Sequence, residues 1–385
     1  MKNEIGKYPN QRAGPHPPSL PVARAGPQAR PKFAAGNDFQ AELRRRVDAF
    51  FQRTGRRARD CPQMYAKTAL ILLGFAAAYG LLVFVVDTWL FALPLAVLLG
   101  LATALIGFNI MHDGGHGAYS RRPAINRLMA ASLDLIGGSS YLWHWKHGVL
   151  HHTYPNVSGH DVDLDLGIFG RLTPHQRRWA HQRWQHWYIW PLYGVLAIKW
   201  HLYDDFRDLL VGRIGRLPFP RPRGRELAIL VAGKLAFFGL VLGIPLLVHP
   251  LWVVLVFYGI SAFVLGMALS LVFQLAHCVE EAAFPQPAAD TQRIERPWAV
   301  HQVETTVDFL RRSRVAAWVL GGLNFQVEHH LFPRICHVNY PALSHLVEQT
   351  CGEFGIRYNE HKSLWAGIGS HTRWLRRMGM AGGTA

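Results

Sequence analysis

Four long, charge-poor stretches dominate what this chain can fold into. No charged side chain occurs in residues 68–86, 89–111 or 251–276. The fourth stretch, residues 227–248, carries only Lys234, which we expect to extend back toward the nearer membrane surface. A helix needs about 20 apolar residues to cross a bilayer, and buried helices of soluble proteins seldom run so long without a charge. We therefore predict an all-α integral membrane protein with four transmembrane helices over these ranges.

The gaps within each pair of stretches are very short. Two residues separate the first pair (87–88) and two separate the second (249–250). Because a spanning backbone must satisfy its own hydrogen bonds in lipid, each pair is predicted to be a helical hairpin. None of the 41 Lys and Arg residues lies in either turn, and such residues favour the cytoplasmic side. Both termini and residues 112–225 and 277–365 are therefore predicted to be cytoplasmic, the latter two forming a helical cap.

The formal net charge of +16 agrees with this topology. A basic chain usually binds nucleic acid or lies against a membrane. Because the basic residues gather in the predicted cytoplasmic segments, we assign the charge to anionic membrane lipid and expect no nucleic-acid partner. The four cysteines show no paired spacing, so free thiols are predicted.

The flanking segments differ in character from the membrane stretches. Residues 1–36 are rich in proline and are predicted to form a flexible tail. No signal peptide is expected, because about 65 residues precede the first apolar stretch. Residues 37–60 carry apolar side chains at helical spacing among arginines, which predicts an amphipathic helix on the membrane surface. We assign residues 61–365 to one membrane domain and residues 366–385 to a second tail.

Histidines cluster just outside the predicted membrane helices. The candidate metal ligands are His112 and His116, His147, His151 and His152, His277, and His329 and His330. A pair spaced i, i+4 projects from one face of a helix and suits two imidazoles on one metal. On an α-helix His147 and His151 share such a face. His152 would point about 100° away and reach a second metal.

Eight imidazoles in one place need an explanation. They would repel one another if protonated and would be poorly satisfied if buried and neutral. Metal coordination removes both problems, and eight exceed the coordination sphere of one ion, so we predict two. Imidazole suits zinc, copper and iron alike, so the residues leave the metal open. Gln326, one turn before the last pair, offers an additional oxygen ligand.

The sequence resembles the membrane fatty acid desaturase family over roughly residues 60–365. That family is marked by three histidine boxes at cytosolic helix ends that hold a diiron centre. Residues 133–155, 298–309 and 321–341 also resemble family sequences. The box at 326–330, QVEHH, is most similar to the bacterial linoleoyl-CoA-desaturase-like branch and to the front-end desaturases, whereas most members have histidine at its first position.

The resemblance implies an O₂-dependent enzyme that introduces a cis double bond into the acyl chain of an acyl-CoA or acyl-lipid, toward the carboxyl end. It implies two iron ions on the eight histidines, with Gln326 a weak ligand. Asp113 and Glu328 are expected to accept hydrogen bonds from the ligating imidazoles. Asp161, Asp163 and Asp165 suit the same role, but we interpret them as a solvated acidic loop.

The electrons for this reaction must come from outside residues 60–365, the region that resembles the family. Many front-end relatives carry a fused cytochrome b5 domain with an HPGG heme motif, which this sequence lacks. We therefore expect a separate donor, a ferredoxin or a cytochrome b5 with its reductase. The resemblance also suggests a bacterial inner membrane as the location. An apolar tunnel leading to the irons is expected to position the acyl chain, because such a chain offers no polar handle.

Two alternatives use the same residues. A diiron acyl or lipid hydroxylase differs only in the step after the first hydrogen abstraction. A membrane metal transporter would place ligands near the bilayer midplane, but the four apolar stretches contain no His, Asp or Glu. Of the other histidines near the boxes, His144 is assigned to packing. Whether His301 contacts iron stays open.

Overall fold

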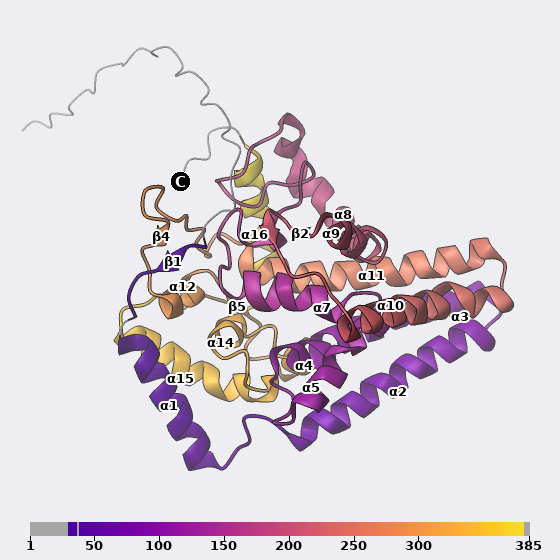
Figure 1. Cartoon of the computed structure of the whole chain (residues 1–385), viewed down its shortest axis with the longest axis horizontal. Coiled ribbons are helices and arrows are strands. Elements are labelled where there is room, and N and C mark those ends of the chain that lie inside the picture. Colours follow the sequence, from indigo (N-terminus) through magenta and orange to yellow (C-terminus); the bar gives the residue numbers. More distant parts are fainter. Residues whose placement is uncertain (1–29, 37, 381–385) are drawn as a thin grey trace, which may run out of the picture.

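The computed structural model describes residues 30–36 and 38–380, and this part of the chain is mostly helical. Figure 1 shows the long helices extending to one side and shorter helices gathered at their other end. The α-helices are α1 (Asp38–Thr54), α2 (Pro62–Phe84), α3 (Trp89–Ile106), α4 (His112–His116), α5 (Pro123–Ala130), α6 (Ser132–Leu135), α7 (Ser140–Trp143), α8 (Gln185–Lys199), α9 (Asp205–Val211), α10 (Arg225–Phe238), α11 (Leu251–His277), α12 (Trp298–Glu304), α13 (Arg314–Val319), α14 (Gln326–Leu331), α15 (Tyr340–Glu353) and α16 (Leu364–Gly379).

Irregular helical turns and short strands connect these helices. The π-helical segments are Gly107–Met111, His144–His151, Trp200–Asp204 and Gly239–Gly243. The 3₁₀ segments are Val162–Leu164, Ala180–Trp184, Pro245–Leu247 and His337–Asn339. The strands are β1 (Lys32–Phe33), β2 (Arg213–Ile214), β3 (Leu217–Pro218), β4 (Arg293–Ile294), β5 (Asp308–Phe309) and β6 (Glu360–His361). β1 pairs with β4 and β5 with β6 in parallel, and β2 pairs with β3 antiparallel.

Within the described residues, four helices are long and apolar enough to cross a membrane, the number predicted. They cover Pro62–Phe84, Trp89–His116, Arg225–Leu247 and Leu251–His277, so each contains one of the predicted stretches almost completely. Large apolar side chains such as Leu90 remain exposed on them, as expected of surfaces that face lipid rather than water. Within the bundle α3 packs against both α2 and α11.

Lys234 ends in the protein interior and not in solvent, contrary to our expectation. Its side chain is buried, and its Nζ donates hydrogen bonds to Asp205 Oδ2 at 2.8 Å and to the Gly137 carbonyl at 2.6 Å. A buried ammonium needs partners of this kind to offset its lost hydration. Both partners lie far from Lys234 in sequence, so the local pattern does not reveal them.

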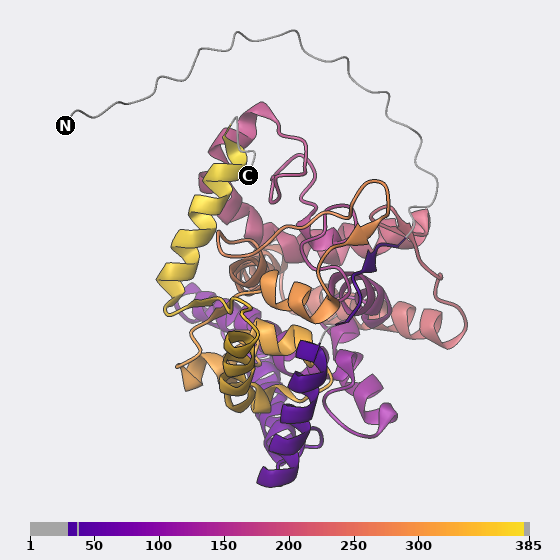
Figure 2. The same ribbon diagram turned by 90° about the vertical axis from the view of Figure 1, so that its left-hand side faces the viewer.

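Helix α1 packs on the protein. Phe39 and Leu43 are buried with Val300 of α12 and Val347 of α15 in one apolar cluster, and Figure 2 shows α1 beside α15. The apolar face that we assigned to the membrane surface is thus covered by other helices. Helical spacing identifies an apolar face, but it does not identify what covers that face.

Each predicted tail contains regular secondary structure next to the membrane domain. Residues 30–36 contain β1, whereas residues 1–29 lie outside the described part of the chain. Most of the predicted tail at 366–385 is helix α16, with Trp374 and Leu375 buried against α8. Its apolar side chains recur at helical spacing between arginines, the same signal that predicted α1. The four cysteines are free, as predicted.

Candidate metal centre

The first pair of histidines stands on α4, which continues α3 through the π-helical turn. Two glycines between the histidines allow this helix to be packed closely. A Cβ on Gly115 would lie 2.2 Å from the ring of Trp143, and one on Gly114 would lie 2.6 Å from the backbone nitrogen of Ala130. Contacts that short are not possible, so glycine at both positions lets Trp143 and α5 approach the histidine-bearing helix.

The box that contains His147, His151 and His152 lies on and directly after a π-helix, and this changes the predicted arrangement. The His152 amide donates to the His147 carbonyl at 3.0 Å, an i to i+5 bond. This bond brings His152 next to His147, with their Nε2 atoms 3.2 Å apart. His147 also stays beside His151, with ring centroids 5.0 Å apart, so only the direction predicted for His152 is wrong. π-helical segments are frequent at functional sites.

A tight loop brings the box at 326–330 close to the box at 112–116. Gly321 has φ +60°, and a Cβ there would lie 2.2 Å from the Phe108 carbonyl oxygen. The loop therefore passes directly against the π-helical turn that precedes α4. Helix α14 follows and carries His329 and His330, both buried.

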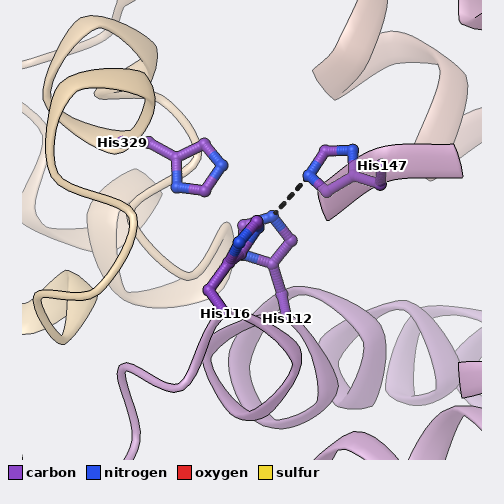
Figure 3. A group of neighbouring side chains, drawn as sticks. All are labelled: His112, His116, His147 and His329. Carbon is purple, nitrogen blue, oxygen red and sulfur yellow. Dashed lines mark hydrogen bonds between the residues drawn. The ribbon is translucent and has the colours of Figure 1, made fainter. Parts of the chain in front are cut away.

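The structure gathers all eight predicted ligands into two adjoining groups. The first histidine group consists of His112, His116, His147 and His329, whose ring nitrogens lie within 4.8 Å of one another. Figure 3 shows these four rings directed toward a common space from three segments of the chain. The second histidine group consists of His151, His277 and His330, again within 4.8 Å. His152 lies within the same distance of His329 and His330, between the groups.

The free nitrogens fit metal ions. Buried ring nitrogens without a hydrogen-bond partner among the described residues include Nε2 of His116, His151, His277, His329 and His330 and Nδ1 of His152. Unpartnered buried polar atoms are costly, so their convergence calls for a ligand. The Nε2 atoms of His112 and His147 are 3.3 Å apart. Two nitrogens bound at about 2.1 Å to one ion lie about 3.0–3.4 Å apart at ordinary coordination angles.

Burial also sets the charge state of the rings. Loss of hydration, together with the neighbouring histidines, holds the pKa of His147, His152, His329 and His330 well below the usual value. These rings are neutral near pH 7, the form that binds metals. His151 differs: burial alone would lower its pKa, but the Asp161 carboxylate outweighs burial and raises it.

Hydrogen bonds to residues that are not candidate ligands orient the rings of the second histidine group. Asp161 Oδ2 accepts from His151 Nδ1 at 3.0 Å, and Gln302 Oε1 accepts from His330 Nδ1 at 2.9 Å. His277 Nδ1 lies 3.3 Å from the Thr305 carbonyl oxygen. Such partners fix the tautomer and leave Nε2 free for a metal. Asp161 is thus buried at the site, so its interpretation as a solvated residue is wrong, and no pattern in the sequence pointed to Gln302.

The two predicted outer carboxylates have other partners. Asp113 Oδ2 accepts from Nδ1 of His337 at 3.0 Å, and His337 Nε2 lies 3.0 Å from Lys67 Nζ. Glu328 Oε1 accepts from the Tyr358 hydroxyl at 2.9 Å. Among the described residues neither carboxylate hydrogen-bonds a candidate ligand, because each side chain turns toward the surrounding protein. This part of the prediction is wrong.

The remaining candidates lie beside the two groups. Gln326 is buried, and its Nε2 donates to the Leu323 carbonyl at 2.8 Å. His301 is buried against Phe33, with ring centroids 5.2 Å apart, and belongs to neither group. His144 is exposed and also belongs to neither. The role of Gln326 as a weak ligand stays a prediction.

Apolar helices of membrane-spanning length that end in converging buried histidines define a membrane-embedded metalloenzyme. The fatty acid desaturase profile matches residues 87–362, and the chain belongs to that family. It is 38% identical over 351 residues to the sn-1 linoleoyl-lipid 6-desaturase of Synechocystis sp., covering 91% of this chain and 98% of that one.

Two further relatives are also desaturases by name. The acyl-lipid (8-3)-desaturase of Physcomitrium patens is 37% identical over 90% of this chain and 73% of its own length. The Delta(5) fatty acid desaturase A of Dictyostelium discoideum is 32% identical over 91% of this chain and 76% of its own. Membership makes this protein a fatty acyl desaturase, an iron-dependent oxidoreductase that uses O₂. Neither the hydroxylase nor the transporter alternative is favoured.

Proposed function

We propose that this chain is a front-end acyl-lipid desaturase whose two histidine groups hold a diiron centre. The observation that carries the proposal is the convergence of eight histidine rings, six of them with an unpartnered buried nitrogen. The names of the similar proteins, which include a linoleoyl-lipid 6-desaturase and a Delta(5) desaturase, support an acyl-lipid substrate and insertion toward the carboxyl end.

The chain's own residues would hold one iron in each histidine group, with His152 between them. When bound, the iron pair supplies the O₂ chemistry needed to remove hydrogen from an unactivated methylene, which no acid or base side chain can do. Asp161, Gln302 and the Thr305 carbonyl hold three of the rings in the orientation that directs Nε2 to the metal. Six of the eight histidines are buried, which would limit the access of water to the site.

The membrane helices supply a site for the acyl chain. A cavity of about 450 Å³ lies among α2, α3, α10 and α11 and is lined mainly by apolar side chains. A second cavity of about 20 Å³ is lined by Met111, the residue before His112. Ile136, His201 and Leu265 line both cavities. We assign the large cavity to the methyl end of the acyl chain and the small one to its approach to the metals.

The arrangement in the membrane follows from the charge pattern. We propose that α2 with α3, and α10 with α11, form two hairpins, and that the histidine-bearing helices form a cap on the cytoplasmic side together with both termini. The basic residues flanking the apolar stretches support this orientation. A separate ferredoxin or cytochrome b5 would deliver electrons to this side, at a bacterial inner membrane.

Fatty acid analysis tests the proposal. A host that co-expresses a compatible electron donor is fed linoleate, and its lipids are analysed by gas chromatography–mass spectrometry with double-bond derivatisation. We expect a new double bond on the carboxyl side of the existing ones with wild type and with His345→Ala, a control outside both histidine groups, and none with His151→Ala. A hydroxylated product would replace the proposal with the hydroxylase. A double bond on the methyl side would overturn the front-end assignment.

A further inference from the structure

The buried Lys234 holds a piece of backbone in place. Its Nζ donates to the Gly137 carbonyl at 2.6 Å and to Asp205 Oδ2 at 2.8 Å, while Asp205 Oδ1 accepts from Trp200 Nε1 at 3.0 Å. Lys234 and Asp205 are both buried, and a lysine amid a stretch otherwise free of charge is costly unless it has a specific role. Lys234 therefore ties α10 to the loop that follows α6 and to Asp205 on α9.

The loop is confined from two sides. Gly137 has φ +103°, a conformation that other residues rarely adopt. A Cβ at this position would lie 2.5 Å from His201 Cδ2 and 2.8 Å from Phe237 Cζ. The backbone here is therefore held between one ring from α10 and one from the segment after α8.

This confined loop lies where the two cavities meet. Ile136, directly before Gly137, lines both the large cavity and the small one, and so does His201. The small cavity also contains Gly138 and reaches Met111, next to the first histidine group. We define the constriction as Ile136, His201 and Leu265, the residues that line both cavities.

A second ion pair links the constriction to the metal centre. Helix α9 begins with Asp205 and also carries Asp208, whose Oδ2 lies 2.8 Å from Lys146 Nζ. Lys146 precedes His147 on the π-helical segment. The same short helix therefore anchors the membrane helix through one acid and the histidine segment through the other.

We propose that the Lys234–Asp205 pair is a positioning device that fixes the constriction relative to the metal centre and so sets which carbon pair is desaturated. This rests on the proposed function, because it assumes an acyl chain that passes from the large cavity to the metals. An apolar chain has no polar handle, so its register depends on the shape of the wall. The bond from Lys234 to the Gly137 carbonyl, with Lys234 itself fixed by Asp205, keeps that shape.

The test removes the pair without leaving a buried unpaired charge. In Lys234→Met/Asp205→Asn the amide still accepts from Trp200, and replacing both charges avoids the large penalty of replacing one. Ile136→Ala widens the constriction directly. Lys199→Met, which removes an exposed partner of Asp204, is the control.

Iron content is measured on each purified variant. The position of the new double bond is measured in the lipids of the host that expresses it. We expect the double variant and Ile136→Ala to load iron like wild type but to place the double bond at more than one position, with the minor product at least about a tenth of the total. Lys199→Met should give the single wild-type product.

The outcomes separate this inference from the proposed function. A single wild-type product from the iron-loaded double variant overturns the positioning role, and so does complete loss of product from iron-loaded protein, because mispositioning predicts misplaced rather than absent double bonds. Loss of iron from the double variant also overturns it, since the pair would then serve the metal site. If wild type itself forms no double bond, the proposed function fails instead.

Discussion

The two histidine groups are held in different ways, although they adjoin. In the second group each ring has an acceptor for Nδ1: Asp161, Gln302 or the Thr305 carbonyl. In the first group, the longer 3.4 Å contact of His329 Nδ1 with the Tyr340 hydroxyl is the comparable bond among the described residues. The first group relies on packing instead, with the Trp143 ring stacked on His147 and edge-on to His116.

The two groups therefore illustrate two ways of fixing imidazole rings before a metal binds. Directed hydrogen bonds fix the tautomer as well as the orientation of a ring, whereas packing fixes orientation alone. The second group is thus sensitive to the loss of a single acceptor atom. The first is sensitive to the loss of volume around it.

The largest effect should come from removing one ring from either group. We expect His151→Ala and His329→Ala to lower desaturation by more than about a hundredfold and iron from two ions to about one or fewer, because each deletes a ligand. Inductively coupled plasma mass spectrometry of purified protein measures the iron, with His345→Ala as control. If either variant still bound two irons, the histidine replaced in it would not be a metal ligand.

The next largest effect should come from Asp161→Asn, which keeps the shape but removes the charge that orients His151. Loss of such an outer partner costs about 10–100-fold in metal affinity or activity. Asp163→Asn, a neighbouring carboxylate whose Oδ2 is 3.8 Å from His151 Nδ1, is the matched control and should cost less. Iron retention in a chelator titration compares the two. Equal losses would show that general negative charge, rather than the 3.0 Å bond, matters.

How much of this could be predicted depends on which interactions are local. The four apolar helices and all eight histidines follow from runs and spacings visible in the sequence, and the structure brings these histidines together. Their division into groups does not follow, because it depends on the π-helical register at 144–151. The acceptors Gln302 and Thr305 reach the site only through the packing of α12, and nothing in their spacing indicates this.

The pH dependence of iron release should also differ between the groups. Asp161 raises the pKa of His151, whereas burial lowers that of His147 and His329. A raised pKa means that His151 takes up a proton at a higher pH, and a protonated imidazole cannot bind metal. As pH falls from neutral, we therefore expect iron to leave the second group first.

Mössbauer spectroscopy of ⁵⁷Fe-loaded protein, recorded through an acid titration, tracks the two irons separately. His330→Ala, which weakens only the second group, identifies the signal of that group. Simultaneous loss of both irons, or earlier loss from the first group, would contradict the different pKa directions.

The smallest effect should come from Trp143→Phe, which tests packing alone. The smaller ring keeps an aromatic face for His147 but leaves space where Trp143 meets Gly115 and His116. We expect a loss of about 1–2 kcal/mol in the free energy of unfolding, because the surrounding helices close such a space only partly. Iron affinity should fall a few-fold in the first group and stay unchanged in the second. Thermal unfolding and the same Mössbauer titration measure both, with the exposed Trp365→Phe as control. An equal loss from both groups would mean that they form one mechanical unit, in which the hydrogen bonds of the second group also support the first.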